Sequence, residues 1–333
     1  MYMSKLFTKT LRNDPKDETA NSAKLLIRAG YIHKQNAGVY AYLPLGLKVL
    51  ENIKSIIRTE MNRIGGTEIM MTALQNPLPW QKTGRWDDEV MDVWFKTTLH
   101  AGGELGLGAT HEEPITDMLK TYISSYKDLP LYVYQFQTKF RNELRAKSGI
   151  LRTREFLMKD LYSFSISESD HLAFYHSVEQ AYKNIYISLG IGDITHQTFA
   201  SGGSFSKYSH EFQTITPVGE DTIWHNADFS VVLNEEVLTP KVLADLGVKK
   251  SDLTPAKAAE VGNIFTLGYK YSSALGLNFQ NESGETQPVF MGCYGIGVSR
   301  LLGIIAEVFS DEKSLYFPPN IAAFPYQLIP IGN

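Results

Sequence analysis

The 333-residue chain contains little cysteine, no long apolar run and no large surplus of charge. Its one cysteine, Cys293, excludes a disulfide within the chain, and the absence of a CxxC pair or a His/Cys cluster argues against a zinc site. No apolar stretch approaches the roughly 18–20 residues that a membrane-spanning helix needs. Residues 1–19 lack the apolar core of a secretory signal. We therefore expect a protein of the reducing cytoplasm that has no membrane partner.

The overall charge gives no support to a nucleic-acid partner. The formal net charge is −4, whereas proteins that bind nucleic acid non-specifically usually carry a basic surplus. Charge is uneven, however, because basic residues outnumber acidic ones between Lys139 and Lys159. That local excess suits a polyanionic ligand, although a solvated hairpin can carry the same charges.

Helical patterns are present in several places. Apolar residues at three- and four-residue steps predict helices over residues 45–64 and 297–309. A long helix is also expected over 168–189. A further helix is predicted to begin near Glu112, because Pro114 is tolerated in a first turn.

Strand patterns lie between these helices. β-Forming residues predict a strand over 131–141 and a return strand over 153–164, joined by a hairpin loop at 145–151. Shorter strands are expected at 68–71 and 289–291. Together with the helices, these strands predict an α+β fold in which helices cover an antiparallel sheet.

The predicted hairpin carries arginine and glutamate side chains. Arg141 and Glu143 lie at the end of its first strand, and Arg152 begins the return. Arginine suits phosphate oxygens because its planar fork donates hydrogen bonds in pairs and stays charged. A surface hairpin with cross-strand ion pairs, each worth under about 1 kcal/mol, explains the same residues.

A glycine-rich junction precedes the helix at 297–309. The segment from Gly292 to Arg300 has the spacing GxxGxG, which differs from the dinucleotide fingerprint GxGxxG, and no βαβ pattern surrounds it. Small residues would let a ligand approach the backbone while Arg300 meets phosphate at the helix start. A plain glycine-rich turn between strand and helix is the alternative.

The segment Thr110-His111-Glu112-Glu113 opens the predicted helix near Glu112. Buried together, a hydroxyl and a carboxylate would form a seat for a cationic amine. The segment is not a zinc-binding HExxH motif, since no second histidine follows at the required step. An ordinary helix start, with Thr110 as the N-cap, is the alternative.

Seven segments occur in the order typical of one enzyme family. They are RAGYIHKQNAGVYAYLPLGLKVL (28–50), WQKTGRW (80–86), LGATHEEPITD (107–117), YQFQTKFRNELRAKSGILRTREFLMKDLYSF (134–164), SHEF (209–212), LGYKYS (267–272) and MGCYGIGVSR (291–300). In this order they resemble the bacterial-type prolyl-tRNA synthetases, which are class II aminoacyl-tRNA synthetases. The resemblance covers nearly the whole chain apart from about 219–260.

The resemblance implies a class II synthetase-like antiparallel sheet flanked by helices, and usually a homodimer. It assigns residues 1–320 to the catalytic domain, with 219–260 as a short insertion in place of an editing domain. Residues 321–333 resemble the start of a C-terminal anticodon-binding domain. Because the segment 219–260 is too short to hold an editing domain, we expect no hydrolysis of alanyl-tRNA(Pro) by this chain alone. Thr72 stands where the family usually has a proline at the dimer contact.

The resemblance also implies three sets of site residues. The ATP-binding positions are Arg141, Glu143, Arg152, Phe156 and Arg300, of which Arg141 and Arg300 are the catalytic pair. The proline-binding positions are Thr110, Glu112, Arg141, Tyr162 and Phe265. Glu211 is the carboxylate expected to help place Mg²⁺. On the wall that contains Phe265, Asn263 and Thr266 depart from the family pattern.

The implied reaction is ATP-dependent activation of L-proline to prolyl-adenylate, followed by transfer to the 3′ end of tRNA(Pro). Activation needs no protein nucleophile, only in-line positioning and positive charge at the phosphorus centre. Two alternatives are an inactive regulatory or binding paralogue and a ligase that charges an acceptor other than tRNA. Retention of Arg141, Glu143 and Arg300 argues against the first.

Overall fold

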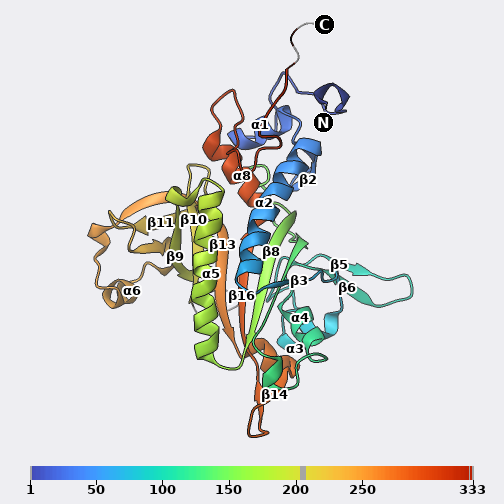
Figure 1. Cartoon of the computed structure of the whole chain (residues 1–333), viewed down its shortest axis with the longest axis vertical. Coiled ribbons are helices and arrows are strands. Elements are labelled where there is room, and N and C mark those ends of the chain that lie inside the picture. The colour runs from blue at the N-terminus through green and yellow to red at the C-terminus, as the bar shows by residue number, and fades with distance from the viewer. Residues whose placement is uncertain (1, 203–207, 330, 332–333) are drawn as a thin grey trace.

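A nine-stranded sheet runs through the centre of the computed structural model, which describes residues 2–202, 208–329 and 331 (Figure 1). In spatial order its strands are β10 (Tyr208–Ile215), β9 (Thr195–Ser201), β12 (Val232–Asn234), β11 (Asp221–His225), β13 (Thr254–Gly268), β16 (Phe290–Gly297), β8 (Glu155–Ser165), β7 (Leu131–Phe140) and β3 (Thr67–Glu68). Neighbours are antiparallel except for the pairs β12–β9 and β3–β7. The predicted α+β fold, an antiparallel sheet flanked by helices, is confirmed.

Long helices cover one face of this sheet. They are α2 (Pro44–Arg63), α5 (Glu168–Ser188) and α8 (Val298–Phe309), which pack on one another and on β8 and β16 (Figure 1). Ile53 and Ile57 on α2 are fully buried in the resulting core, as the helical spacing of apolar residues predicts. The helices predicted at 45–64, 168–189 and 297–309 are therefore confirmed.

Shorter elements cover the opposite face and enclose the site. They are α3 (Pro77–Thr83), α4 (Glu112–Leu119), α7 (Lys270–Leu275) and a small sheet of β4 (Leu74–Gln75), β6 (Glu104–Leu107) and β5 (Lys96–Thr98). Apolar side chains of α4 pack on Val133, Tyr162 and Phe265 of the main sheet. The remaining elements include α1 (Asn21–Arg28), β1 (Ile32–Asn36), β2 (Val39–Tyr42), α6 (Pro240–Asp245), β14 (Asn278–Gln280) and β15 (Thr286–Pro288).

The segment expected to replace an editing domain contributes strands to the main sheet. Residues 219–260 supply β11, β12 and the first part of β13, and α6 lies beside them (Figure 1). Because β10 pairs with β13 as well as with β9, the strands from β9 to β13 close into a ring. The division into domains stays a prediction, and Pro330, Gly332 and Asn333 of the expected C-terminal segment lie outside the described residues.

Two local predictions were wrong. The strand expected at 68–71 is only the short edge strand β3, because pairing with β7 ends at Glu68. Gly292 and Gly295 do not form a turn but lie within β16. A side chain at position 292 would place its Cβ 2.5 Å from atoms of His171 and Tyr294, so packing rather than turning requires glycine there.

Other local predictions were correct. β7 and β8 form the hairpin predicted over 131–164, and α4 begins at Glu112 with Pro114 in its first turn. Within residues 2–202, 208–329 and 331, no helix combines the length and apolar character required to cross a bilayer.

Candidate active site

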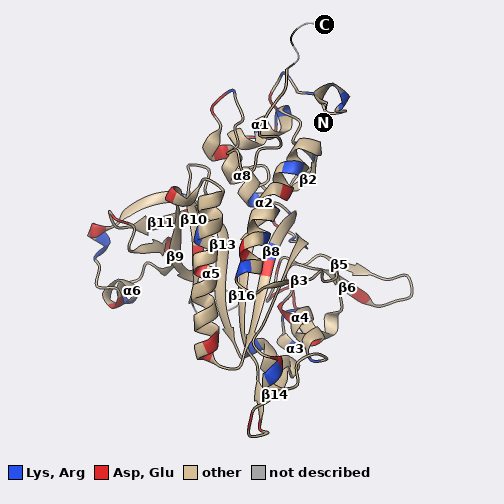
Figure 2. Cartoon of the chain, in the orientation of Figure 1, with Lys and Arg blue, Asp and Glu red and all other residues tan. Residues whose placement is uncertain are grey.

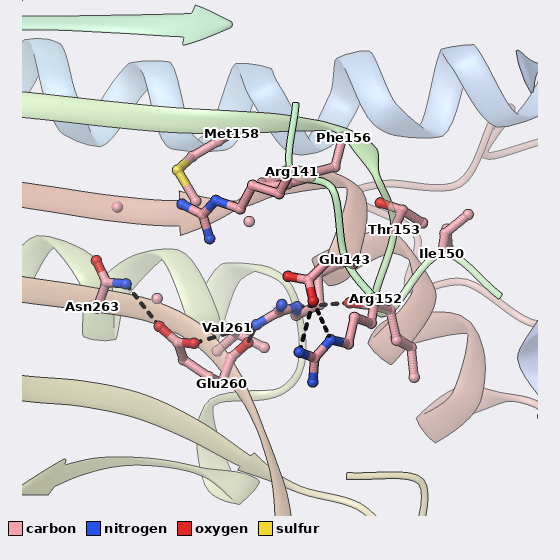
Figure 3. A pocket seen from close by; sticks show the side chains of 15 residues that line it. Arg141, Glu143, Ile150, Arg152, Thr153, Phe156, Met158, Glu260, Val261 and Asn263 are labelled. Carbon is pink, nitrogen blue, oxygen red and sulfur yellow. Dashed lines mark hydrogen bonds and ion pairs between the residues drawn. The ribbon is translucent and has the colours of Figure 1, made fainter. Parts of the chain in front are cut away.

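The residues predicted to bind ATP line a single cleft. Arg141, Glu143, Arg152, Phe156 and Arg300 all contribute to its wall (Figure 3). The floor is formed by the adjacent strands β8, β16 and β13; Arg141 follows the end of β7, and the start of α8 brings in Arg300. The sheet therefore assembles side chains that are far apart in the sequence.

Arg141 directs its guanidinium group into this cleft (Figure 3). Its Nε donates to the carbonyl oxygen of Ala109 at 3.4 Å, and its Cζ lies 5.2 Å from the centre of the Phe156 ring. Among the described residues, no Asp or Glu forms an ion pair with Arg141. Burial lowers the pKa of Arg141, Glu260 opposes this change, and Arg300 acts in the same direction as burial. A guanidinium group that is not held in a direct ion pair is suited to an anionic ligand.

The other two arginines of the cleft are paired with carboxylates. Arg152 donates to Glu143 at 2.7 Å and to Glu220 at 2.8 Å. Arg300 Nη1 lies 2.7 Å from the backbone oxygen and 3.4 Å from the carboxylate of Glu260. The Arg152 side chain is 41% exposed, so its ion pairs are weak and can be exchanged for phosphate oxygens.

Acidic residues from elsewhere in the chain offset the basic excess of the hairpin. Glu220 accepts from both Arg152 and Lys147, the latter at 3.3 Å. In Figure 2, basic and acidic residues likewise alternate along the ribbon of α2, where Lys54 pairs with Glu51. Glu220 thus offsets part of the basic surplus between Lys139 and Lys159.

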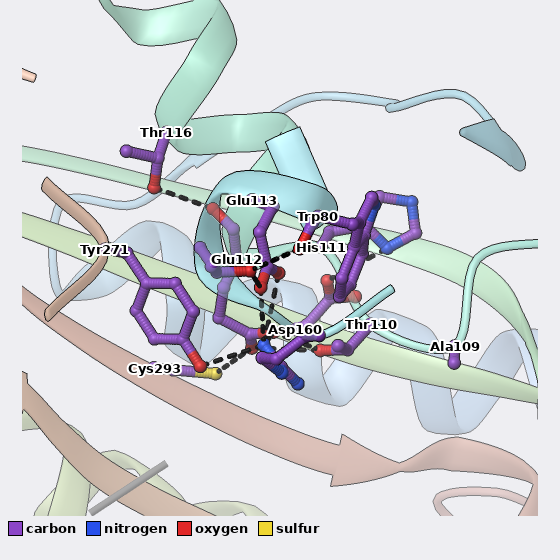
Figure 4. Close-up of polar contacts among 12 residues, drawn as sticks. Trp80, Ala109, Thr110, His111, Glu112, Glu113, Thr116, Asp160, Tyr271 and Cys293 are labelled. Carbon is purple, nitrogen blue, oxygen red and sulfur yellow. Dashed lines mark hydrogen bonds and ion pairs between the residues drawn. The ribbon is translucent and has the colours of Figure 1, made fainter. Parts of the chain in front are cut away.

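Thr110 and Glu112 lie together in a cluster of buried side chains beside the cleft, which we call the buried pocket (Figure 4). The Thr110 hydroxyl donates to Oε2 of Glu112 at 2.7 Å, and the Cys293 thiol donates to Oε1 at 3.3 Å. The N-cap of α4 is His111, and Thr110 does not cap the helix. The interpretation of Thr110 as an ordinary N-cap was therefore wrong, because its hydroxyl is committed to the Glu112 side chain.

Sequence reasoning missed Arg85, whose guanidinium group contacts the acidic side chains of this cluster. Its Nη1 lies 3.4 Å from Glu112, 3.0 Å from Glu113 and 2.8 Å from the hydroxyl of Tyr271 (Figure 4). Burial raises the pKa of Glu113 to about 7, and Glu112 adds to this rise while Arg85 opposes it. One guanidinium thus faces two carboxyl groups, and the group of three gains a net negative charge only as Glu113 ionises, at about pH 7 and above.

A weak signal for Arg85 was present in the sequence. Arg85 belongs to the segment WQKTGRW, and an arginine among tryptophans can be buried by cation–π contact. In the structure its Cζ lies 5.2 Å from the Trp80 ring. Gly84, with φ of +75°, turns the chain after α3 so that Arg85 faces α4.

Tyr162 and Phe265 form the floor of the buried pocket. Both lie opposite Cys293 on strands adjacent to β16, and both are buried. The Tyr162 hydroxyl donates to Asp160 at 2.9 Å and accepts from the backbone N–H of His111 at 3.2 Å. The structure thus brings together Thr110, Glu112, Tyr162 and Phe265, and the carbonyl of Ala109 connects them to Arg141.

Glu211 does not line the cleft, although it lies close behind it. On β10 it pairs with Asn263 of β13, and its carboxylate accepts from Gln213 at 2.9 Å. Burial raises the pKa of Glu211 to about 8, and Glu260 acts in the same direction. Two carboxylates that repel each other favour a divalent cation. Within the described residues, however, no group of three or more His, Cys, Asp or Glu side chains forms a metal site, so phosphate oxygens would have to complete it.

Sequence comparison identifies relatives over nearly the whole chain. The family described as tRNA synthetase class II core domain (G, H, P, S and T) matches residues 95–309. Proline–tRNA ligase of Ehrlichia ruminantium (strain Gardel) is 38% identical over 342 residues, which cover 99% of this chain and 80% of the relative. The same enzyme of Rickettsia rickettsii (strain Sheila Smith) is 38% identical over 343 residues with the same coverage.

Structure comparison finds the same fold. Prolyl-tRNA synthetase of Cryptosporidium parvum, solved with L-proline and AMP, superposes with a TM-score of 0.72 and 16% identity. This match covers 94% of the chain and 56% of that protein. The Giardia lamblia enzyme in complex with prolyl-adenylate gives a TM-score of 0.71 at 18% identity, covering 89% and 54%. The chain therefore spans about half the length of these solved structures. The predicted resemblance is confirmed, and the chain belongs to the prolyl-tRNA synthetase family of class II aminoacyl-tRNA synthetases.

Proposed function

We propose that this chain activates L-proline with ATP to form prolyl-adenylate and then transfers the prolyl group to the 3′ end of tRNA(Pro). The observation that carries this proposal is the placement of opposite charges across residues 109–112. Arg141 lies on one side without an ion-pair partner among the described residues, and the buried carboxyl groups of Glu112 and Glu113 lie on the other. An amino-acid zwitterion carries the complementary charges, with its ammonium toward Glu112 and its carboxylate toward Arg141.

The activation step follows from this placement. A carboxylate oxygen of proline attacks the α-phosphorus of ATP and forms the new P–O bond, while the bond to the β-phosphate oxygen breaks and pyrophosphate leaves. Arg141 stabilises the negative charge that develops at the phosphorus centre. The β- and γ-phosphates of ATP replace carboxylates as the partners of Arg152 and Arg300. Phe156 offers a face for the adenine ring, and Glu143 accepts from its amino group.

Magnesium belongs to the same proposal. Mg²⁺ bound with ATP would neutralise phosphate charge, and Glu211 and Glu260 are the residues that would help to hold it. A homodimer and a cytoplasmic location are predictions that follow from the family resemblance.

Selectivity for proline is proposed to come from the enclosed pocket. Tyr162 and Phe265 present an apolar floor that fits a ring, while Thr110 and Glu112 bind the imino group. A missing methylene is worth only about 1–3 kcal/mol of discrimination, so alanine and cysteine should be activated at lower efficiency.

ATP–pyrophosphate exchange with each amino acid in the presence of Mg²⁺ tests the proposal. We expect proline-dependent exchange, and Arg141→Ala should lower it by about 10²–10³-fold because a charge-stabilising donor is lost. Arg145→Ala, which changes an exposed arginine of the same hairpin, is the matched control and should exchange normally. A folded protein that binds ATP but exchanges with no amino acid would support the inactive paralogue instead. Charging of tRNA(Pro) by the active protein would exclude a different acceptor.

A further inference from the structure

A closed ring of four buried side chains lies beneath the segment that carries Thr110 and Glu112. His111, Lys139, Asp160 and Tyr162 are each at most 2% exposed. Lys139 Nζ lies 2.6 Å from His111 Nδ1 and 2.8 Å from Asp160 Oδ2. The Tyr162 hydroxyl closes the ring by donating to Asp160 and accepting from the backbone of His111.

The hydrogen-bond partners of His111 determine which of its imidazole nitrogens carries a proton. A lysine ammonium group can only donate, so Nδ1 of His111 must accept from Lys139 and carries no proton. The proton then lies on Nε2, which donates to the backbone carbonyl of Thr72 at 3.0 Å. Burial lowers the pKa of His111 to about 4, and Lys139 acts in the same direction while Asp160 opposes it. The imidazole is therefore neutral and held at both nitrogens.

The ring joins the chain segments that surround the buried pocket. Lys139 comes from β7, Asp160 and Tyr162 from β8, and His111 from the start of α4. Through Thr72 the ring also holds the segment that leads into β4, and Gln75 in β4 donates to the carbonyl of Thr110 at 3.0 Å. None of the four ring residues lines the ATP cleft.

We propose that His111, Lys139 and Asp160 are positioning residues for the amino-acid substrate. His111 is held at both imidazole nitrogens and at its backbone N–H. This fixes the orientation of the residues on either side of it, Thr110 and Glu112. The effect should be larger for proline than for ATP, because none of the four residues lines the ATP cleft. This inference rests on the proposed function, since it names the residues that orient the proline-binding pair.

Lysine variants on β7 and β8 test the inference. Lys139→Met should raise the KM for proline in pyrophosphate exchange by at least about tenfold, which is the loss expected for a hydrogen bond to a charged group. The KM for ATP should change by less than about twofold. Lys159→Met is the matched control, because Lys159 is equally buried but donates to Tyr182 on the opposite face of the sheet. That variant can lower stability but should leave the KM for proline unchanged.

Two histidine variants separate the contacts at the two ring nitrogens. The shorter side chain of His111→Asn can still accept a hydrogen bond from Lys139 but cannot reach the carbonyl of Thr72. The longer side chain of His111→Gln can reach that carbonyl but no longer places an acceptor beside Lys139. Each should raise the KM for proline less than Lys139→Met combined with His111→Gln does. Nitrogen-15 NMR of histidine-labelled protein should show His111 protonated at Nε2 only, with a signal that Lys139→Met shifts and Lys159→Met does not.

The outcomes are distinct. Equal rises in the KM for proline and for ATP in Lys139→Met, or equal behaviour of the two lysine variants, would show a purely structural role and overturn the inference. If the wild-type chain exchanges with proline and Lys139→Met keeps its KM, only this inference fails. If the wild-type chain neither exchanges with proline nor binds it in calorimetry, the proposed function fails and the inference fails with it.

Discussion

The two halves of the site hold their charges in different ways. In the open cleft, the Arg152 side chain is 41% exposed and shared between two carboxylates from separate segments. In the buried pocket, Arg85 is 4% exposed and faces Glu112 and Glu113, which are both fully buried. The cleft thus contains charges that can exchange partners, and the pocket contains charges whose partners are fixed.

This difference has an energetic basis. Exposed ion pairs are worth about 0–1 kcal/mol, so phosphate oxygens can replace the carboxylates of the cleft at little cost. Removing one member of a buried charge group leaves the others unpaired in a poorly solvated site, which costs several kcal/mol. We infer that a flexible, multiply charged ligand suits the cleft, whereas a small rigid ligand suits the preformed pocket.

The largest effect should come from Arg85→Met, which removes the guanidinium from the buried pocket. Glu112 and Glu113 would remain buried without it, so the free energy of unfolding should fall by about 3–5 kcal/mol. Urea unfolding followed by circular dichroism measures this. Arg63→Met is the control, because Arg63 forms a surface pair with Glu60 and should cost under about 1 kcal/mol. Equal losses in the two variants would remove the contrast between buried and exposed pairs.

The pH dependence of stability should also report on the pocket. The pKa of Glu113 is about 7 in the folded protein against an ordinary value of 4.5, so between these values the folded state binds more protons than the unfolded state. The free energy of unfolding should therefore fall as pH rises through this window, by up to about 1.4 kcal/mol per pH unit.

Urea unfolding at a series of pH values from about 4.5 to 7.5 checks this slope, with Glu113→Gln as the test variant. The variant cannot titrate at this position, so its slope should be shallower. Glu89→Gln changes an exposed glutamate and should keep the wild-type slope. Parallel slopes for wild type and Glu113→Gln would contradict the prediction.

A smaller effect is expected for Glu112→Gln, which keeps the shape of the pocket and removes the charge that faces the substrate ammonium. The KM for proline should rise by about 10–100-fold, the equivalent of about 1.5–3 kcal/mol for a hydrogen bond to a charged group. The KM for ATP, measured in the same exchange assay, should stay unchanged because Glu112 does not line the cleft. A matching rise in both constants would show that the two halves are not independent.

The smallest effect on stability should come from Arg152→Ala in the open cleft. Its exposed pairs with Glu143 and Glu220 predict a loss under about 1 kcal/mol in urea unfolding. Activity should respond differently, with the KM for ATP raised by about tenfold and the KM for proline unchanged. Arg152→Lys keeps the charge but not the planar fork, so its KM for ATP should lie between those of wild type and Arg152→Ala. A loss of stability like that of Arg85→Met would show that the cleft is as rigid as the pocket.

The sequence by itself determined the elements whose signals are local. Apolar spacing predicted α2 and α8, and β-forming residues predicted the hairpin of β7 and β8, because helix and strand periods are properties of neighbouring residues. The ordered motifs predicted the family and indicated Arg141, Glu143, Arg152, Phe156 and Arg300, which line one cleft in the structure.

Only the tertiary structure decided which charges meet. Arg85 lies 28 residues before Glu113 and 186 residues before Tyr271, and no spacing along the chain predicts that they share one pocket. Glu220 and Glu260 come from a segment without a recognised motif, yet they pair with Arg152 and Arg300.

Two of the three wrong interpretations concern residues whose surroundings in the fold outweigh their local preference. Gly292 and Gly295 read as turn residues in the sequence but lie in β16, where neighbouring side chains leave no room for a Cβ. Thr110 read as an N-cap, but its hydroxyl bonds the Glu112 carboxylate. For Gly292 the deciding contacts come from distant segments, and for Thr110 the burial of the Glu112 carboxylate makes its hydroxyl the hydrogen-bond donor. The packing of the whole fold, which the neighbouring sequence does not reveal, thus outweighs the local preference of each residue.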